Sequence, residues 1–272
     1  GNTTSGFTTI SAGSVTVDQT APASQKTQGV VTTGGDNQVA GYWNSGNTGV
    51  DITVQIADDS SINGGTVQLL VSTDGGGSFV PLDTPSTISA VNTNKTISVA
   101  SGVLEGVAGF GESDVLQFKA TITDTSGNAT TGTVSDTTLT VDQTAATIST
   151  SSIASDNATV TLAKTGDTVT LTIATNENVS SPTVTFTSGG AAATNADTVS
   201  GASPGTSFTS AYTVDASDTD GTVAISITAT DVAGNTTSGF TTISAGSVTV
   251  DTTAPTISTS SIASDNATVT LA

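Results

Sequence analysis

Hydrophobic and polar residues alternate along several short stretches of the chain. In Val50–Ile56, for example, Val, Ile, Val and Ile stand at every second position, separated by Asp, Thr and Gln. Such a period of two, bounded by Gly, Asp, Asn and Ser, is typical of β-strands with one buried face. The pattern predicts strands at 50–56, 66–71, 115–123, 167–173, 183–186 and 221–229.

Little of the chain has the spacing of an amphipathic helix. Only Val103–Ala108 is compatible with one helical turn, and the small residues of Gly189–Ala193 indicate a loop. The expected fold class is therefore all-β.

One stretch recurs along the chain and marks its divisions. Asp231-Val-Ala-Gly-Asn235 leads to Val250-Asp-Thr-Thr-Ala-Pro255, and Asp124-Thr-Ser-Gly-Asn128 leads to Val141-Asp-Gln-Thr-Ala-Ala146. Residues 1–22 repeat residues 234–255 with Gln19 in place of Thr252 as the one difference. Residues 254–272 repeat 145–163, with Pro255 in place of Ala146. Each copy indicates a hairpin turn, a last strand and a linker to the next domain.

The spacing of the linker aspartates predicts the size of the domains. Asp18 and Asp142 are 124 residues apart, and Asp142 and Asp251 are 109 apart. Both distances suit an immunoglobulin-like sandwich of about 100 residues. We therefore expect tandem immunoglobulin-like Greek-key β-sandwich domains. The divisions are a C-terminal strand fragment of a preceding repeat at 1–17, a divergent first domain at 18–141, a second domain at 142–250, and the first strands of a following repeat at 251–272.

The charge of the chain excludes some partners and favours others. There are 23 acidic residues, four lysines, no histidine and a formal charge of −19. Such a surface repels nucleic acid and anionic membrane and attracts cations. It also suits simple solubility in salt. Cysteine is absent, so no disulfide braces these domains.

The Val-Asp-x-Thr-Ala-Pro linkers, Asp-x-x-Gly-Asn turns and Thr/Val-rich strands resemble the tandem bacterial immunoglobulin-like repeats of large surface adhesins. The resemblance covers almost the whole chain and is strongest over 142–272. It implies an extracellular or cell-surface location, a role as extender between an anchor and a binding tip, neighbouring repeats of the same chain as partners, and stiffening by calcium at the joints between domains.

The sandwich topology brings acidic residues together at one end of each domain, because the entry linker and two loops meet there. In the second domain these loops are expected at Asn176–Asn178, between the second and third strands, and at Asp231–Asn235, before the last strand. Calcium takes six to eight oxygen ligands of this kind. The sequence therefore predicts Ca²⁺ sites at the joints. The alternative is that each Asp or Asn only caps its own turn. The candidate metal ligands are Asp18, Asp58, Asp59, Asp124 and Asn128 for the first domain, Asp142, Asn176, Glu177, Asp231 and Asn235 for the second, and Asp251 for a following repeat.

Other motifs favour local structure over chemistry. Asp215–Gly221 resembles the start of a calcium loop but lacks its closing glutamate, so a hairpin turn is expected. Ser72–Phe79 resembles the Asp box of sialidase-like propellers, and its single copy again indicates a hairpin turn. With no histidine, cysteine or arginine to act as base or nucleophile, an enzyme is not expected.

Two further functions stay open. Tyr42 and Trp43 could stack on a sugar ring, which would make the first domain a carbohydrate-binding module, or they could close its core. Alternatively, residues 1–17 and 252–272 could add strands to neighbouring copies and build an extracellular fibre, filament or surface layer.

Overall fold

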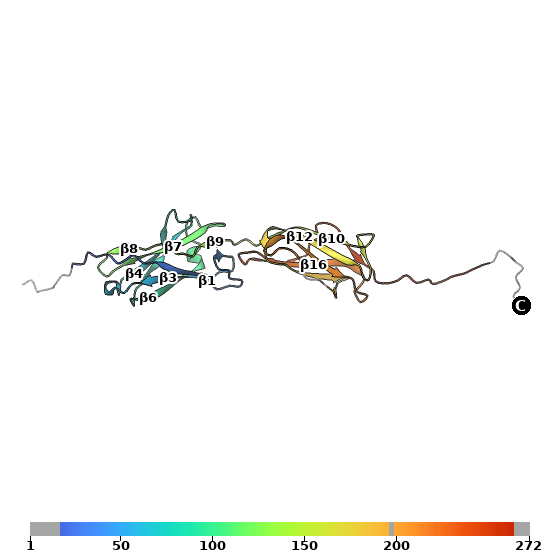
Figure 1. The fold of residues 1–272 in the computed structure, drawn as a ribbon, viewed down its shortest axis with the longest axis horizontal. Helices are drawn as coiled ribbons and strands as arrows, with labels where there is room; N and C mark the ends of the chain where they lie inside the picture. Colours follow the sequence, from blue (N-terminus) through green and yellow to red (C-terminus); the bar gives the residue numbers. More distant parts are fainter. Residues whose placement is uncertain (1–16, 196–198, 264–272) are drawn as a thin grey trace, which may run out of the picture. The chain divides into compact units, whose positions relative to one another are not determined.

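The computed structural model describes residues 17–195 and 199–263 of the chain (Figure 1). It divides the protein into two compact units. Unit 1 comprises residues 1–145 and 232–235, and unit 2 comprises residues 146–231 and 236–272. The described part contains no helix that is long and apolar enough to cross a membrane.

Unit 1 is a sandwich of two sheets. One sheet has the order β1-β3-β6, and the other has the order β2-β9-β7-β4-β5, with β8 paired to β7. The strands are β1 (Thr27–Thr33), β2 (Tyr42–Trp43), β3 (Gly49–Ile56), β4 (Thr66–Ser72), β5 (Val80–Thr87), β6 (Thr93–Ala100), β7 (Val115–Thr123), β8 (Ala129–Thr131) and β9 (Leu139–Val141). Two short helices, η1 (Ser60–Ile62) and α1 (Ser101–Leu104), lie in its connections.

Unit 2 repeats this topology. Its sheets have the orders β10-β12-β15 and β11-β18-β16-β13-β14, with β17 paired to β16. The strands are β10 (Ile148–Ser155), β11 (Leu162–Ala163), β12 (Thr168–Val179), β13 (Thr183–Ser188), β14 (Ala191–Ala192), β15 (Gly205–Thr213), β16 (Gly221–Thr230), β17 (Thr236–Phe240) and β18 (Thr249–Val250). In both units a short early strand pairs parallel to the last strand, β2 with β9 and β11 with β18. The fold is therefore a tandem of immunoglobulin-like Greek-key sandwiches.

The alternating strands bury one face between the two sheets of each unit. In β7 the residues Leu116, Phe118, Ala120 and Ile122 are buried, and the residues between them are partly exposed. In β16 the residues Val223, Ile225, Ile227 and Ala229 are buried in the same alternating way. Each fully buried large aliphatic or aromatic side chain stabilises its unit by about 1.5–3 kcal/mol relative to an exposed one. Because the described residues include no cysteine, each unit is stabilised by its own hydrophobic core and not by disulfides.

The strands that were predicted from alternation are confirmed, within one to several residues at their ends. Three details differ. The helical turn begins at Ser101, two residues earlier than predicted. The predicted loop at 189–193 contains the two-residue strand β14, whose Ala192 pairs with Thr187. The expected loop at Asn176–Asn178 is wrong, because β12 continues through an irregular register to Val179.

The predicted terminal fragments fall partly outside the described residues. Residues 1–16 and 264–272 of the fragments at 1–17 and 251–272 lie there. The described residues 251–263 contain no strand. The first buried hydrophobic residue of unit 2 is Ala146, four positions after the predicted boundary residue Asp142.

Candidate functional site

The turn Asp124–Asn128 is built around the carboxylate of Asp124. Its Oδ1 accepts hydrogen bonds from the backbone amides of Ser126 (2.8 Å) and Asn128 (2.9 Å), and its Oδ2 accepts one from Asn128 Nδ2 (3.0 Å). The hydrogen bond from the Asn128 side chain and those from the backbone amides lower the pKa of Asp124, against the opposing effect of desolvation. Gly127 has a φ of 95°, a backbone conformation that favours glycine.

The same asparagine also binds the entry linker of unit 1. Asn128 Nδ2 donates a hydrogen bond of 3.2 Å to the carbonyl oxygen of Asp18. The Asp18 carboxylate accepts the backbone amide of Thr20 at 3.0 Å, so it caps the linker locally. The Asp-x-x-Gly-Asn turn is thus a clamp on the chain that enters the unit.

Of the other predicted ligands at this end, Asp59 has a local structural role. Asp59 caps η1 by accepting the hydroxyl and amide of Ser61 at 2.7 and 2.9 Å, and these bonds lower its pKa. The nearby charge of Asp124 raises the Asp59 pKa only slightly by comparison. Asp58 is exposed. Within the described ranges, Asp18, Asp58, Asp59 and Asp124 do not form a group of three carboxylates with ligand geometry.

Residues Val232–Asn235 of the second Asp-x-x-Gly-Asn turn belong to unit 1, although they come late in the sequence. Asn235 Nδ2 donates hydrogen bonds to the carbonyl oxygen (2.9 Å) and the carboxylate (3.3 Å) of Asp142. Asn235 Oδ1 accepts both the amide (3.0 Å) and the hydroxyl (2.8 Å) of Ser45. The carbonyl oxygen of Ala233 accepts Asn44 Nδ2 at 2.8 Å. The turn is therefore held by the linker and by the loop after β2.

Gly234 is required at the tip of this turn. Its φ is 99°, and a Cβ there would lie 2.2 Å from the carbonyl oxygen of Asn37. The glycine of the Asp-x-x-Gly-Asn motif therefore serves both the turn conformation and the close approach of a second backbone segment.

In unit 2, two of the predicted calcium ligands lie close together. Carboxylate oxygens of Glu177, at the end of β12, and Asp231, just after β16, lie within 4.8 Å of each other. Asp231 is buried and bridges to Val179 through the backbone. The side chain of Asn176 has a structural role, since its Oδ1 accepts the amide of Thr147 at 2.7 Å. Two carboxylates this close offer oxygen ligands of the kind that calcium takes.

The exit linker of unit 2 is also clamped, by a residue that the sequence did not single out as a site. Asp220 accepts hydrogen bonds from the amide (2.7 Å) and hydroxyl (2.8 Å) of Thr252 and from the hydroxyl of Thr253 (2.7 Å). Asp251 accepts the Thr253 amide at 3.0 Å, which is a local cap. The one signal in the sequence for Asp220 was its position directly before β16. Its partner Thr252, 32 residues later, could not be predicted from spacing.

The segment Asp215–Gly221 forms a turn, but the predicted hairpin is wrong, because β15 and β16 on either side of it belong to different sheets. Asp215 accepts the amide and hydroxyl of Ser217 at 2.9 and 2.7 Å, and Asp218 accepts the amide of Asp215 at 2.9 Å.

Trp43 lies in the core of unit 1, which contradicts the carbohydrate-binding interpretation. Its exposed fraction is 0%, and its Nε1 donates a hydrogen bond of 3.1 Å to Glu105 Oε1. The parallel pairing of β2 with β9 directs Trp43 inward, while Tyr42 is only partly buried. A buried indole has no face to offer a sugar ring.

The sequence Ser72–Phe79 forms the expected hairpin turn between β4 and β5. Asp74 accepts the hydroxyl of Ser72 (2.5 Å) and the amide and hydroxyl of Ser78 (3.0 and 2.9 Å). These hydrogen bonds hold the pKa of Asp74 far below its usual range, and the bond from the Ser72 hydroxyl has the largest effect. Lys119 Nζ lies 3.8 Å from the centre of the Phe79 ring. The hydroxyls of Ser72 and Ser78 and the carboxylate of Asp74 are thus hydrogen-bonded within the turn.

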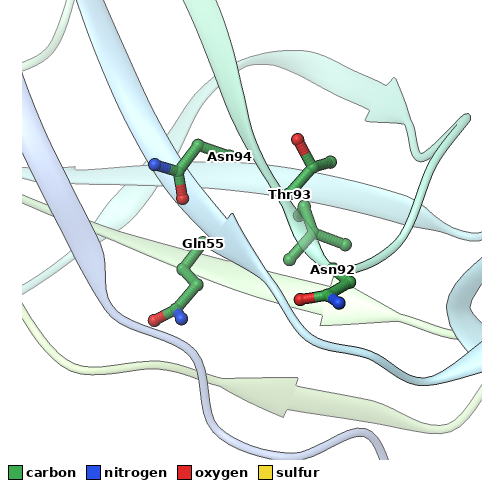
Figure 2. A pocket seen from close by; sticks show the side chains of 5 residues that line it. Gln55, Asn92, Thr93 and Asn94 are labelled. Atoms are coloured by element: carbon green, nitrogen blue, oxygen red, sulfur yellow. The ribbon is translucent and has the colours of Figure 1, made fainter.

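A shallow pocket of about 280 Å³ lies at the end of the β1-β3-β6 sheet (Figure 2). It is lined by Gln55, Ile56, Asn92, Thr93 and Asn94. Figure 2 shows the amide side chains of Gln55 and Asn94 on neighbouring strands, and the two residues pair in register. The lining offers amide and hydroxyl groups and no ionisable side chain, so it supplies neither an acid nor a base for catalysis.

A comparison with protein-family models finds no match, and neither does a comparison with curated proteins. Among solved structures, the I-band fragment I67–I69 of titin is 10% identical, with a TM-score of 0.37, and the alignment covers 85% of this chain and 63% of titin's fragment. A tetra-tandem repeat in the extending region of a large adhesion protein is 20% identical, with a TM-score of 0.29, over 85% of this chain and 50% of that one. A marsupial T cell receptor is 14% identical, with a TM-score of 0.27, over 81% and 98%. The chain thus spans about half to two thirds of the length of the titin fragment and of the adhesion-protein fragment.

Proposed function

We propose that the chain is a structural, non-catalytic extender segment of a long bacterial surface protein. In each unit, the entry and exit linkers are held at opposite ends of one long strand, and this observation carries the proposal. In unit 2 the entry residue Thr147 binds Asn176. Thr237 of β17, which pairs near the end of β16, binds the carbonyl of Ala146. The exit residue Thr252 binds Asp220, directly before β16 begins.

Unit 1 has the same arrangement along β7. Its entry residue Asp18 is bound by Asn128, shortly after β7 ends. The backbone amide of its exit residue Val141 donates a hydrogen bond of 2.8 Å to the carbonyl oxygen of Asp114, which lies just before β7 begins. A strand of nine or ten residues spans about 30 Å. Each unit therefore adds about that length to the chain that passes through it.

Calcium at the joints would stiffen such a segment. The proposed ligands in unit 2 are Glu177 and Asp231, whose carboxylates lie within 4.8 Å of each other. Asp142 lies four residues before Ala146, so the chain can bring its carboxylate within about 14 Å of that core residue. Asp142 of the entry linker is the proposed third acidic ligand. The proposed location is the cell surface, and the proposed partners are neighbouring repeats.

The test is the length of chains with increasing numbers of repeats. Copies of residues 142–250 are inserted in tandem, and the maximum dimension is measured by small-angle scattering. The proposal predicts a constant increase of about 30 Å or more for each added copy. A dimension that stays nearly constant as copies are added would contradict an extender. Growth of particle mass with protein concentration would favour the fibre subunit instead.

A further inference from the structure

The loops that follow β2 and β11 are built in the same way. In unit 1, the amide of Asn44 donates to Asn47 Oδ1 (2.8 Å) and the amide of Asn47 donates back to the carbonyl of Asn44 (3.2 Å). In unit 2, the amide of Lys164 donates to Asp167 Oδ2 (2.9 Å) and the amide of Asp167 donates to the carbonyl of Lys164 (3.0 Å). Asn44-Ser-Gly-Asn47 and Lys164-Thr-Gly-Asp167 are therefore equivalent loops.

The loop of unit 1 holds an Asp-x-x-Gly-Asn turn through one asparagine. Asn235 Oδ1 accepts two hydrogen bonds from Ser45, and Asn235 Nδ2 donates to the carbonyl of Asp142. Asp142 itself is held in place because its amide donates to the carbonyl of Trp43 at 2.9 Å. Three groups thus recognise the asparagine: an amide and a hydroxyl from the loop, and a carbonyl from the linker.

Unit 2 presents the same three groups. Thr165 stands in the position of Ser45 and carries an amide and a hydroxyl, and it is exposed. Asp251 stands in the position of Asp142, and its amide donates to the carbonyl of Ala163, also at 2.9 Å. A pocket of about 420 Å³ lies between them, lined by Lys164, Thr165 and residues 251–255.

We propose that the Lys164–Gly166 loop and the Asp251 carbonyl form a docking site for the Asp-x-x-Gly-Asn turn of a repeat that follows unit 2 in the same chain. Residues 254–272 repeat residues 145–163 with one difference, so the sequence that follows β18 starts a repeat of the kind that carries this turn. The asparagine of the turn receives the two donors of Thr165 and donates to Asp251. The inference rests on the proposed extender function and names the partner that each unit receives at its exit end.

One substitution between the loops fits this role. Lys164 replaces Asn44, whose Nδ2 donates to the carbonyl of Ala233. The Lys164 ammonium is also a donor for a backbone carbonyl, and its side chain is 67% exposed while it pairs with Asp167 at 2.6 Å. The acidic turn motif is, in addition, attracted to the positive charge of the lysine.

Disulfide trapping in an extended chain tests the docking site. Adding residues 164–250 after Ala272 completes a further copy of the unit 2 sequence, and the chain has no native cysteine. The test pair is Thr165→Cys with cysteine at the added copy of Asn235. The positive control is Ser45→Cys with Asn235→Cys, because those side chains are in direct contact. The negative control pairs the same added cysteine with Thr170→Cys, an exposed residue of β12.

The proposal predicts that the test pair closes a disulfide like the positive control and at least about tenfold faster than the negative control, since docking raises the effective concentration of the two thiols. Closure no faster than with Thr170→Cys, while the positive control closes, would overturn it. Scattering of the cysteine-free extended chain separates the two proposals. An increase in length without trapping leaves the extender function intact and removes the docking site.

Discussion

Asn128 Nδ2 donates a hydrogen bond of 3.2 Å to the carbonyl oxygen of Asp18, a residue 110 positions earlier in the chain. The same side chain binds Asp124 within its own turn. A single amide group thus connects the hairpin after β7 to the linker that enters unit 1.

Replacing this residue, Asn128→Ala, should lower the free energy of unfolding of unit 1 by about 1–2 kcal/mol, because the partly buried carbonyl and the buried carboxylate of Asp124 both lose a donor. Urea unfolding followed by Trp43 fluorescence measures it. Ser126→Ala is the matched control, since the Ser126 contact with Asp124 comes from the backbone amide and is retained. Equal stability of the two variants would show that the clamp contributes nothing.

Trp43 is the one tryptophan of the chain and is completely buried. Its fluorescence should therefore be blue-shifted, resistant to quenching by acrylamide, and unchanged by soluble sugars. It should report the unfolding of unit 1 alone. Emission typical of water-exposed indole, or quenching by a sugar, would contradict the core position and restore the carbohydrate-binding interpretation.

Asp167 makes the stability of unit 2 depend on pH. Hydrogen bonds from Asn157 and Lys164, with the charge of Lys164, lower the pKa of Asp167 from its ordinary value of 3.8 to about 2. A lowered pKa in the folded state means that the stabilisation is complete above the unfolded pKa and is lost as the pH falls through the folded one. The thermal midpoint of unit 2 should therefore drop between about pH 4 and pH 2.

The variant Asp167→Asn isolates this effect. Asparagine can still accept the backbone amide of Lys164, as Asn47 accepts that of Asn44 in unit 1. The variant should be less stable than the wild type at neutral pH, and the two midpoints should converge toward pH 2. Calorimetry across this range measures both. A constant difference at every pH would show that the charge of Asp167 does not contribute.

Two glycines of unit 1 should respond differently to the same substitution. A Cβ on Gly132 would lie 1.8 Å from the carbonyl of Gln25, so Gly132→Ala forces apart the backbone segments that the Lys26–Thr133 bridge joins. We expect a loss of about 1–3 kcal/mol in urea unfolding. A Cβ on Gly102 in α1 meets nothing within 4 Å, so Gly102→Ala should be neutral or slightly stabilising. The reverse order of the two variants would contradict the close approach of Gly132 to the Gln25 backbone.

The sequence predicted the strands and the fold class well, because alternation is a local signal with a direct physical cause. Val50–Ile56 alternates since one face of β3 packs on the opposite sheet. The Asp-x-x-Gly-Asn turns were also predictable, since Asp124 and Gly127 satisfy the turn within five residues.

Long-range partners were not predictable in the same way. Asp220 binds Thr252, and Ser45 binds Asn235, through pairings that depend on where the β-strands place their ends. Asn176 was expected as a calcium ligand, yet its oxygen binds the amide of Thr147. The sequence shows where a side-chain oxygen stands in the chain, but the group that binds this oxygen depends on the folded structure.

The calcium-stiffened extender is tested most directly by small-angle scattering of the full chain, with calcium and then with excess chelator. The account predicts a shorter or broader distribution of maximum dimensions, and a lower thermal midpoint, once calcium is removed. The double variant Glu177→Gln, Asp231→Asn should behave like the chelated wild type under both conditions. Identical dimensions and midpoints with and without calcium would contradict the account and leave these carboxylates with local structural roles alone.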